Sequence, residues 1–171
     1  MLTDETKQSI LDLQKMYPIK RSALLPALHL AQAEVGYLPR EVQDEVAVLF
    51  DLDPNEVNAV VTFYDMFFDE PVGKHLIHVC TNISCMLHGS DSLLDKVCHK
   101  LKVKLREVTS DGEFCVFSSE CLAACDRAPM MLVDDKVVGP VEDKDLDRIL
   151  EEAKNNRGHS SPIYNQEVEN A

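Results

Sequence analysis

Four cysteines, arranged as two pairs, are the residues of this 171-residue chain best suited to chemistry. Four residues separate Cys80 from Cys85, three separate Cys121 from Cys125, and thirty-five residues lie between the pairs. Each pair closely follows a predicted β-strand. Thiolate is the ligand that selects iron–sulfur, zinc or copper(I) centres. Four thiolates that converge on one point therefore favour a soft metal centre.

The predicted positions of these cysteines suit such convergence. In open α/β sheets, ligands bind beyond the carboxyl ends of the strands. Cys80 closes the first predicted strand and Cys85 lies in the loop before a helix, whereas Cys121 and Cys125 lie in the loop after the second strand. If those strands are parallel neighbours, both pairs emerge at the same end of the sheet. The two loops could then hold one centre between them.

Spacing alone leaves three kinds of site open. Structural zinc also takes four cysteines, usually in pairs two to four residues apart. A dithiol oxidoreductase would normally show C-x-x-C after the first strand, and here the gap is four residues. A [2Fe–2S] cluster takes four cysteinyl ligands, although the spacing differs from the plant-type C-x4-C-x2-C run. We favour the cluster, with zinc as the alternative.

Composition and charge narrow the class of protein. With 45% hydrophobic and 27% charged residues, the chain has the composition of a folded protein. Its 17 Lys and Arg against 30 Asp and Glu give a net charge of −13, which argues against binding to nucleic acid or to anionic membranes. No apolar run approaches the roughly 20 residues of a membrane span, and the acidic N-terminus does not resemble a secretory signal. We therefore expect a reducing compartment, where clustered cysteines indicate metal or redox chemistry.

The chain is expected to have an α/β fold in two parts and a tail. Residues 1–72 read as a small helical bundle, whose four helices begin near Thr3, Ser22, Pro39 and Asp53. Residues 73–156 have the order β-α-β-β-β-α, which is the core of a thioredoxin-like domain and begins with a parallel crossover unit. Its predicted elements cover residues 75–79, 89–103, 114–117, 130–133, 136–138 and 142–155. Residues 157–171 are a polar C-terminal tail, expected to be disordered or wrapped on a partner.

Several stretches together resemble one known family. They are Val-Cys-Thr-Asn-Ile-Ser-Cys at 79–85, Cys-Leu-Ala-Ala-Cys-Asp-Arg-Ala-Pro-Met at 121–130 and Thr-Phe-Tyr-Asp-Met-Phe at 62–67, with Gly-Tyr-Leu-Pro at 36–39 and Pro-Val-Gly-Lys at 71–74. The chain is similar, from about residue 5 to 155, to the thioredoxin-fold [2Fe–2S] subunit of NADH:quinone oxidoreductase (the E subunit of respiratory complex I). The resemblance implies that Cys80, Cys85, Cys121 and Cys125 are the four cluster ligands.

The resemblance also implies a function and a partner. The chain would carry single electrons on one [2Fe–2S] cluster, exchanging them with a partner subunit that binds FMN and NADH. The sequence shows no G-x-G-x-x-G after a strand, so we expect no catalytic residue and no complete active site in this chain alone. The implied location is cytoplasmic, on the inner face of the membrane through the larger complex, without direct insertion. An equivalent diaphorase subunit of an NAD(P)-linked hydrogenase or formate dehydrogenase is the alternative from the same module.

Other residues near the motif are expected to have structural roles, and one residue differs from the usual family sequence. Cys98 and Cys115 are expected to be small core residues. His88 follows Cys85 but is not needed as a ligand. The family usually has glycine where Ala123 stands, and a methyl group there could exclude a positive φ.

The charge of the cluster indicates its redox behaviour. Two ferric ions, two sulfides and four thiolates sum to −2, so a low reduction potential is expected. Plant-type clusters with the same ligands have potentials of about −400 mV.

Overall fold

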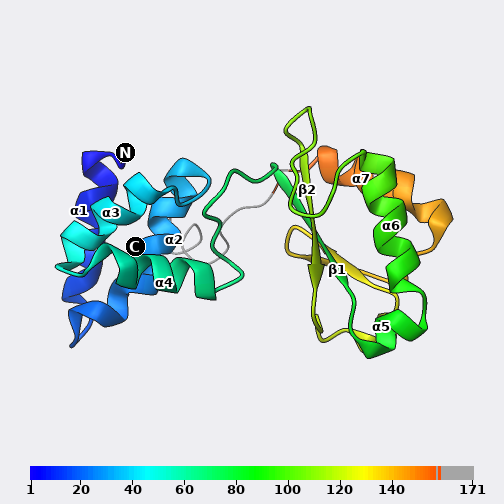
Figure 1. Ribbon diagram of the computed structural model, residues 1–171, viewed down its shortest axis with the longest axis horizontal. Coiled ribbons are helices and arrows are strands. Elements are labelled where there is room, and N and C mark those ends of the chain that lie inside the picture. Colours follow the sequence, from blue (N-terminus) through cyan, green and yellow to red (C-terminus); the bar gives the residue numbers. More distant parts are fainter. Residues whose placement is uncertain (157, 159–171) are drawn as a thin grey trace. The chain divides into compact units, whose positions relative to one another are not determined.

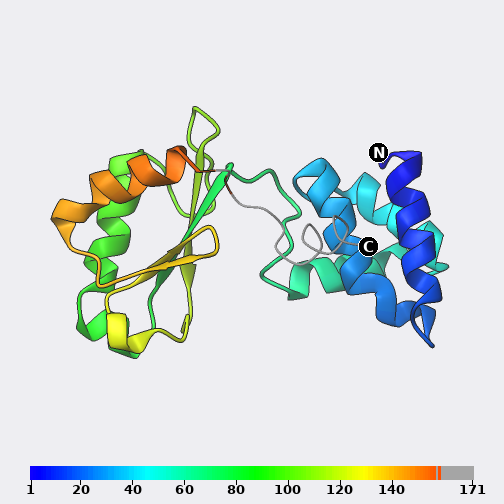
Figure 2. The same ribbon diagram turned by 180° about the vertical axis from the view of Figure 1, so that it is seen from behind.

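The computed structural model describes residues 1–156 and Gly158, in two compact units. The first unit is Met1–Pro71 and the second begins at Val72. Figures 1 and 2 show that the first unit consists of helices and that the second is built on a sheet. Apart from Gly158, the tail predicted over residues 157–171 lies outside the described residues. Among the residues that are described, no helix is long and apolar enough to cross a bilayer.

The first unit contains the four predicted α-helices. Thr3 and Asp53 cap the first and last of them, because their side chains accept hydrogen bonds from the backbone N–H of Thr6 and Asn55. Ser22 is not the cap that we expected: it lies inside a 3-10 helix that leads directly into the second α-helix. The elements are α1 (Asp4–Lys15), η1 (Lys20–Ala23), α2 (Leu24–Val35), α3 (Arg40–Phe50) and α4 (Pro54–Phe63).

Every α-helix of this unit contributes to one apolar core. Ile10, Leu28, Val46 and Val57 are fully buried there. The aromatic-rich segment that begins at the end of α4 divides between core and surface. Phe67 and Phe68 are buried, whereas Phe63 is 77% exposed and Met66 is 45% exposed.

The second unit has the predicted order of strands and α-helices, with one additional α-helix and two short 3-10 helices. Strand β1 pairs in parallel with β2, and β3 and β4 form an antiparallel hairpin beside β1, so the sheet order is β2-β1-β3-β4. The additional α-helix is α5, whose five residues are too few to show helical periodicity. The elements are β1 (His75–Cys80), α5 (Ile83–Leu87), α6 (Ser90–Leu101), β2 (Phe114–Ser119), η2 (Cys125–Arg127), β3 (Met131–Val133), β4 (Lys136–Val138), η3 (Asp143–Asp145) and α7 (Leu146–Lys154).

Helices α6 and α7 lie on the same side of the sheet (Figures 1 and 2). Val97 of α6 and Ile149 of α7 share a core with Ile77 and Val79 of the central strand β1. This packing holds β1 between two partner strands and beneath two helices. The carboxyl end of β1, where Cys80 lies, is therefore held in place by the core.

Candidate metal centre

The two cysteine-bearing loops begin side by side because the strands that lead into them are parallel and in register. Cys80 pairs with Ser119 at the end of the β1–β2 ladder. Beyond it, the backbone N–H of Thr81 donates to the carbonyl oxygen of Ser119 at 2.8 Å. Next along, the Asn82 amide donates to the Glu120 carboxylate at 3.1 Å. Three successive contacts therefore hold the loop after β1 against the loop after β2.

The two cysteine pairs differ in exposure. Cys80 and Cys85 are 3% and 1% exposed and pack with Met130, whereas Cys121 and Cys125 are exposed. The sulfur atoms of Cys121 and Cys125 are 4.0 Å apart. Two thiolates on one tetrahedral metal, with metal–sulfur bonds of about 2.3 Å, lie roughly 3.8 Å apart. The exposed pair is thus already spaced for a shared metal ion.

Backbone N–H groups point at the sulfurs from both loops and from the approach to β3. Cys80 accepts from the N–H groups of Asn82 and of Leu122, and Leu122 belongs to the opposite loop. The N–H of Met130 is hydrogen-bonded to the sulfur of Cys85, and that of Ala123 donates to Cys121 at 3.4 Å. Such donors stabilise thiolate, which is the form that binds metal.

The pKa values of the cysteines follow from this environment. Burial raises the pKa of Cys80, but hydrogen bonds from the Leu122 and Asn82 N–H groups and from Cys85 outweigh it, so the pKa lies below its ordinary value. For Cys85, burial together with the neighbouring Cys80 and Cys125 raises the pKa. Cys121 raises the pKa of Cys125 in the same way. Sulfurs from both loops thus repel one another as anions, and bound cations would relieve that repulsion.

The donor set fits a dinuclear centre held by two pairs of thiolates. Cys80 and Cys85 are hydrogen-bonded to each other through their side chains, and the sulfur atoms of Cys121 and Cys125 lie 4.0 Å apart. A structural zinc site requires four donors around one ion. A [2Fe–2S] cluster requires only two thiolates on each iron, and the sulfurs here are arranged as two such pairs. The residues present therefore fit this cluster.

Ala123 adopts the backbone conformation that its methyl group was expected to hinder. Its φ is +59°, in the left-handed region that favours glycine. The exposed turn accommodates the methyl group, and the N–H of the same residue reaches Cys121. Ala123 therefore holds a positive φ in this turn at the cost of local strain.

The remaining candidates lie outside the cysteine cluster. Cys115 is buried in β2 and Cys98 is partly buried on α6, and burial raises the pKa of both thiols. The Nδ1 atom of His88 lies 2.7 Å from the carbonyl oxygen of Ser84, within its own turn. Sequence reasoning did not find the N–H donors of Asn82, Leu122 and Met130. Any residue type can present a backbone N–H, so the sequence carried no signal for them.

Comparison with known proteins gives the class. The family model of the thioredoxin-like [2Fe-2S] ferredoxins matches residues 10–154. The chain belongs to this family, and its cofactor is one [2Fe–2S] cluster.

Named proteins from several bacteria are similar to most of this chain. The NADH-quinone oxidoreductase E subunit 2 of Rhizobium meliloti is 42% identical over 135 residues, which are 79% of this chain and 80% of that protein. The NADH-quinone oxidoreductase E subunit of Aquifex aeolicus is 39% identical over 132 residues, 77% of this chain and 82% of that protein. Among solved structures, a NAD+-reducing [NiFe]-hydrogenase matches with a TM-score of 0.66 at 24% identity, over 77% of this chain and 23% of that one. At that identity the hydrogenase match supports the fold alone.

Proposed function

We propose that this chain is the [2Fe–2S] electron-transfer subunit of an NADH:quinone oxidoreductase, and that Cys80, Cys85, Cys121 and Cys125 hold its cluster. The observation that carries the proposal is that the two cysteine-bearing loops meet, because the Leu122 N–H of one loop is hydrogen-bonded to the Cys80 sulfur of the other. When bound, the cluster supplies one-electron redox chemistry. The relatives, at 30–43% identity, bear the name of the same subunit.

The chain's own residues divide the work of holding the cluster. Cys80 and Cys85, buried against Met130, form the inner wall of the site and exclude water from that side. N–H groups from Asn82, Leu122, Ala123 and Met130 orient the thiolates and offset part of their negative charge. Cys121 and Cys125 are exposed and form the solvent-facing side of the site, from which a redox partner would approach.

The partner in this proposal is a subunit that binds FMN and NADH. The chain lacks a dinucleotide-binding glycine motif, so hydride must be accepted elsewhere and electrons must reach this site singly. The helical part, residues 1–72 in our division, would serve docking. The location would be cytoplasmic, on the inner face of the membrane through the larger complex.

The test is reduction by NADH with and without the partner. NADH added to the purified holoprotein alone should leave its EPR spectrum unchanged, because the sequence has no dinucleotide-binding glycine motif. The same addition in the presence of the FMN-binding subunit should produce a one-electron EPR signal. Rapid reduction of the isolated chain by NADH would contradict the proposed division of labour.

A second candidate is a diaphorase subunit of an NAD(P)-linked hydrogenase or formate dehydrogenase, since a NAD+-reducing [NiFe]-hydrogenase contains the same fold. The higher identity to the quinone oxidoreductase subunits makes the respiratory complex the preferred assignment. Affinity purification from the native membrane fraction separates the two. Membrane subunits of a quinone oxidoreductase should accompany the chain in the first case, and a hydrogenase or formate dehydrogenase catalytic subunit in the second.

A further inference from the structure

One carboxylate joins β1 to the β3–β4 hairpin at the end of the sheet opposite Cys80. Asp134 occupies the hairpin turn, and its Oδ1 accepts the backbone N–H of Leu76 at 3.0 Å. Its Oδ2 lies 3.0 Å from Nδ1 of His75, and its own N–H donates to the carbonyl oxygen of Leu76 at 2.8 Å. A single residue of the turn therefore holds two consecutive residues of the central strand through three contacts.

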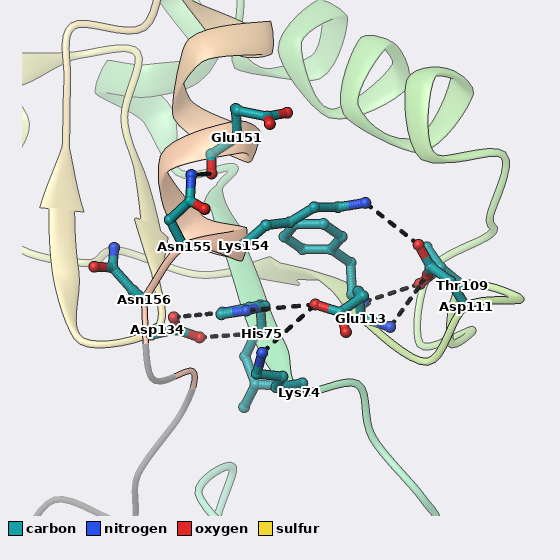
Figure 3. A network of polar contacts seen from close by, with 12 residues as sticks. Lys74, His75, Thr109, Asp111, Glu113, Asp134, Glu151, Lys154, Asn155 and Asn156 are labelled. Atoms are coloured by element: carbon teal, nitrogen blue, oxygen red, sulfur yellow. Dashed lines mark hydrogen bonds and ion pairs between the residues drawn. The ribbon is translucent and has the colours of Figure 1, made fainter.

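The histidine in this contact is shielded from water. His75 is fully buried, and its ring packs against Phe114 with centroids 5.3 Å apart. Figure 3 shows His75 between Asp134 and Glu113, with the Glu113 carboxylate 3.8 Å from Nε2. The backbone of Gly158 lies against the same ring, since a Cβ there would be 3.5 Å from its Cε1. Because water is excluded, the contact between imidazole and carboxylate is stronger than it would be at the surface.

Apart from the burial of β3 side chains and its short ladder with β1, few groups fix the register of the hairpin. Strands β3 and β4 have three residues each, and β4 is largely exposed. The Asp134–Asp135 turn lacks the glycine that two-residue hairpin turns favour, although Asp134 has a φ of +55°. A slip of one residue would turn the buried Met131 and Val133 away from the core. The three contacts of Asp134 with β1 add to this burial in setting the register.

The register of β3 determines where Met130 lies. Met130 directly precedes β3, and its carbonyl oxygen accepts the backbone N–H of Cys80 at 3.2 Å. Its own N–H is bonded to the sulfur of Cys85. A shift of β3 along β1 would remove both contacts, although the hairpin turn lies at the far end of the strand.

We propose that Asp134, held by His75, is a register clamp that positions Met130 against Cys80 and Cys85. Asp134 is a positioning residue: it acts on the cluster site through β3 and touches none of the cysteines. The inference rests on the ligand set proposed above, since it gives Cys80 and Cys85 a cluster to hold.

Glycine substitution tests whether the Asp134 carboxylate, rather than the fit of the residue to the turn, positions the hairpin. Asp134→Gly gives a residue better suited to positive φ but removes the carboxylate, and Asp135→Gly at the exposed neighbour is the matched control. In the full-length holoprotein, Asp134→Gly should lose its cluster to a chelator about tenfold faster than wild type. The Cys80 amide should also exchange hydrogen about tenfold faster, because its bond to Met130 is released. Asp135→Gly should stay within about twofold of wild type in both measurements.

A second matched pair covers the case in which Asp134→Gly does not fold. Asp134→Asn keeps one oxygen acceptor for Leu76 but loses the charged contact with His75, so its cluster loss and Cys80 exchange should exceed those of Asp135→Asn by about threefold. Equal rates within either pair would overturn the clamp. If wild type holds no cluster, the proposed function fails instead, and hydrogen exchange at Cys80 still decides whether the clamp exists.

Discussion

Cys80 and Cys125 sit in different surroundings although both belong to the candidate site. Cys80 is buried and accepts two backbone N–H groups, whereas Cys125 is exposed at the surface beside Cys121. The four cysteines could be identified from the sequence because thiolate chemistry depends on residue type and spacing. Their N–H donors could not, because they are set by backbone conformation. At the scale of residues, the sequence therefore predicts the candidate ligands but not what orients them.

Serine substitution tests the proposed ligands one at a time. Cys80→Ser and Cys125→Ser should each lower cluster occupancy, since a hydroxyl is a harder and weaker ligand than thiolate. Cys98→Ser should retain full occupancy, because Cys98 lies on α6 outside the site. Iron and acid-labile sulfide per chain are the measurement. Full iron content in either of the first two variants would remove that residue from the ligand set.

Glycine at position 123 tests the strain in the cluster loop. Ala123→Gly should raise the free energy of unfolding by about 1 kcal/mol, because it relieves a methyl group at positive φ. Ala124→Gly is the control: Ala124 has a φ of −123°, so glycine there should lower stability by about 0.5–1 kcal/mol. Urea unfolding followed by circular dichroism measures both. Destabilisation by Ala123→Gly would show that the loop is not strained.

The secondary-structure elements follow their sequence patterns where the pattern is long. Short β-type runs and the spacing of the hairpin were sufficient to predict β1, β2 and the β3–β4 pair, and the parallel β1–β2 pairing follows from the crossover connection. Helix α5 was missed because one turn has no period to detect. Ser22 was misassigned because a capping residue type also suits a 3-10 turn, and only the packing of α2 decides between them.

Substitution of Gly139 tests how closely β4 packs against the segment that follows the cysteine loop. A Cβ at Gly139, just after β4, would press on the Arg127 carbonyl oxygen and lie 2.8 Å from the Cβ of Met130. Gly139→Ala should therefore lower the free energy of unfolding by about 1–3 kcal/mol, as overpacking does. Lys136→Ala, on an exposed position of β4, is the control and should change it by about 0.5 kcal/mol or less. Similar urea midpoints for the two variants would mean that Gly139 has room to move.

At the scale of the whole molecule, charge sets the expected behaviour. The chain carries a net charge of −13, and an oxidised cluster with four thiolates carries −2, so the one electron that the cluster accepts meets an unfavourable field. The same repulsion acts between the thiolates when iron is absent. The acidic character is a direct property of the sequence, and the family match supplies the cofactor.

Removal of iron should therefore destabilise the protein. Chelation under reducing conditions leaves thiolates of both loops facing one another, so the apoprotein should unfold at a lower temperature than the holoprotein. Matched thermal scans by circular dichroism, with the same chelator and reductant concentrations in both samples, measure the difference. An unchanged unfolding temperature would indicate that the loops do not depend on the cluster.

The most direct test of the central claim is the metal content and EPR spectrum of the anaerobically purified chain. If sulfurs from the two loops share one [2Fe–2S] cluster, the protein should be coloured and contain about two irons and two sulfides per chain. Dithionite should then produce a one-electron EPR signal. A colourless, EPR-silent protein with about one zinc per chain would contradict the account.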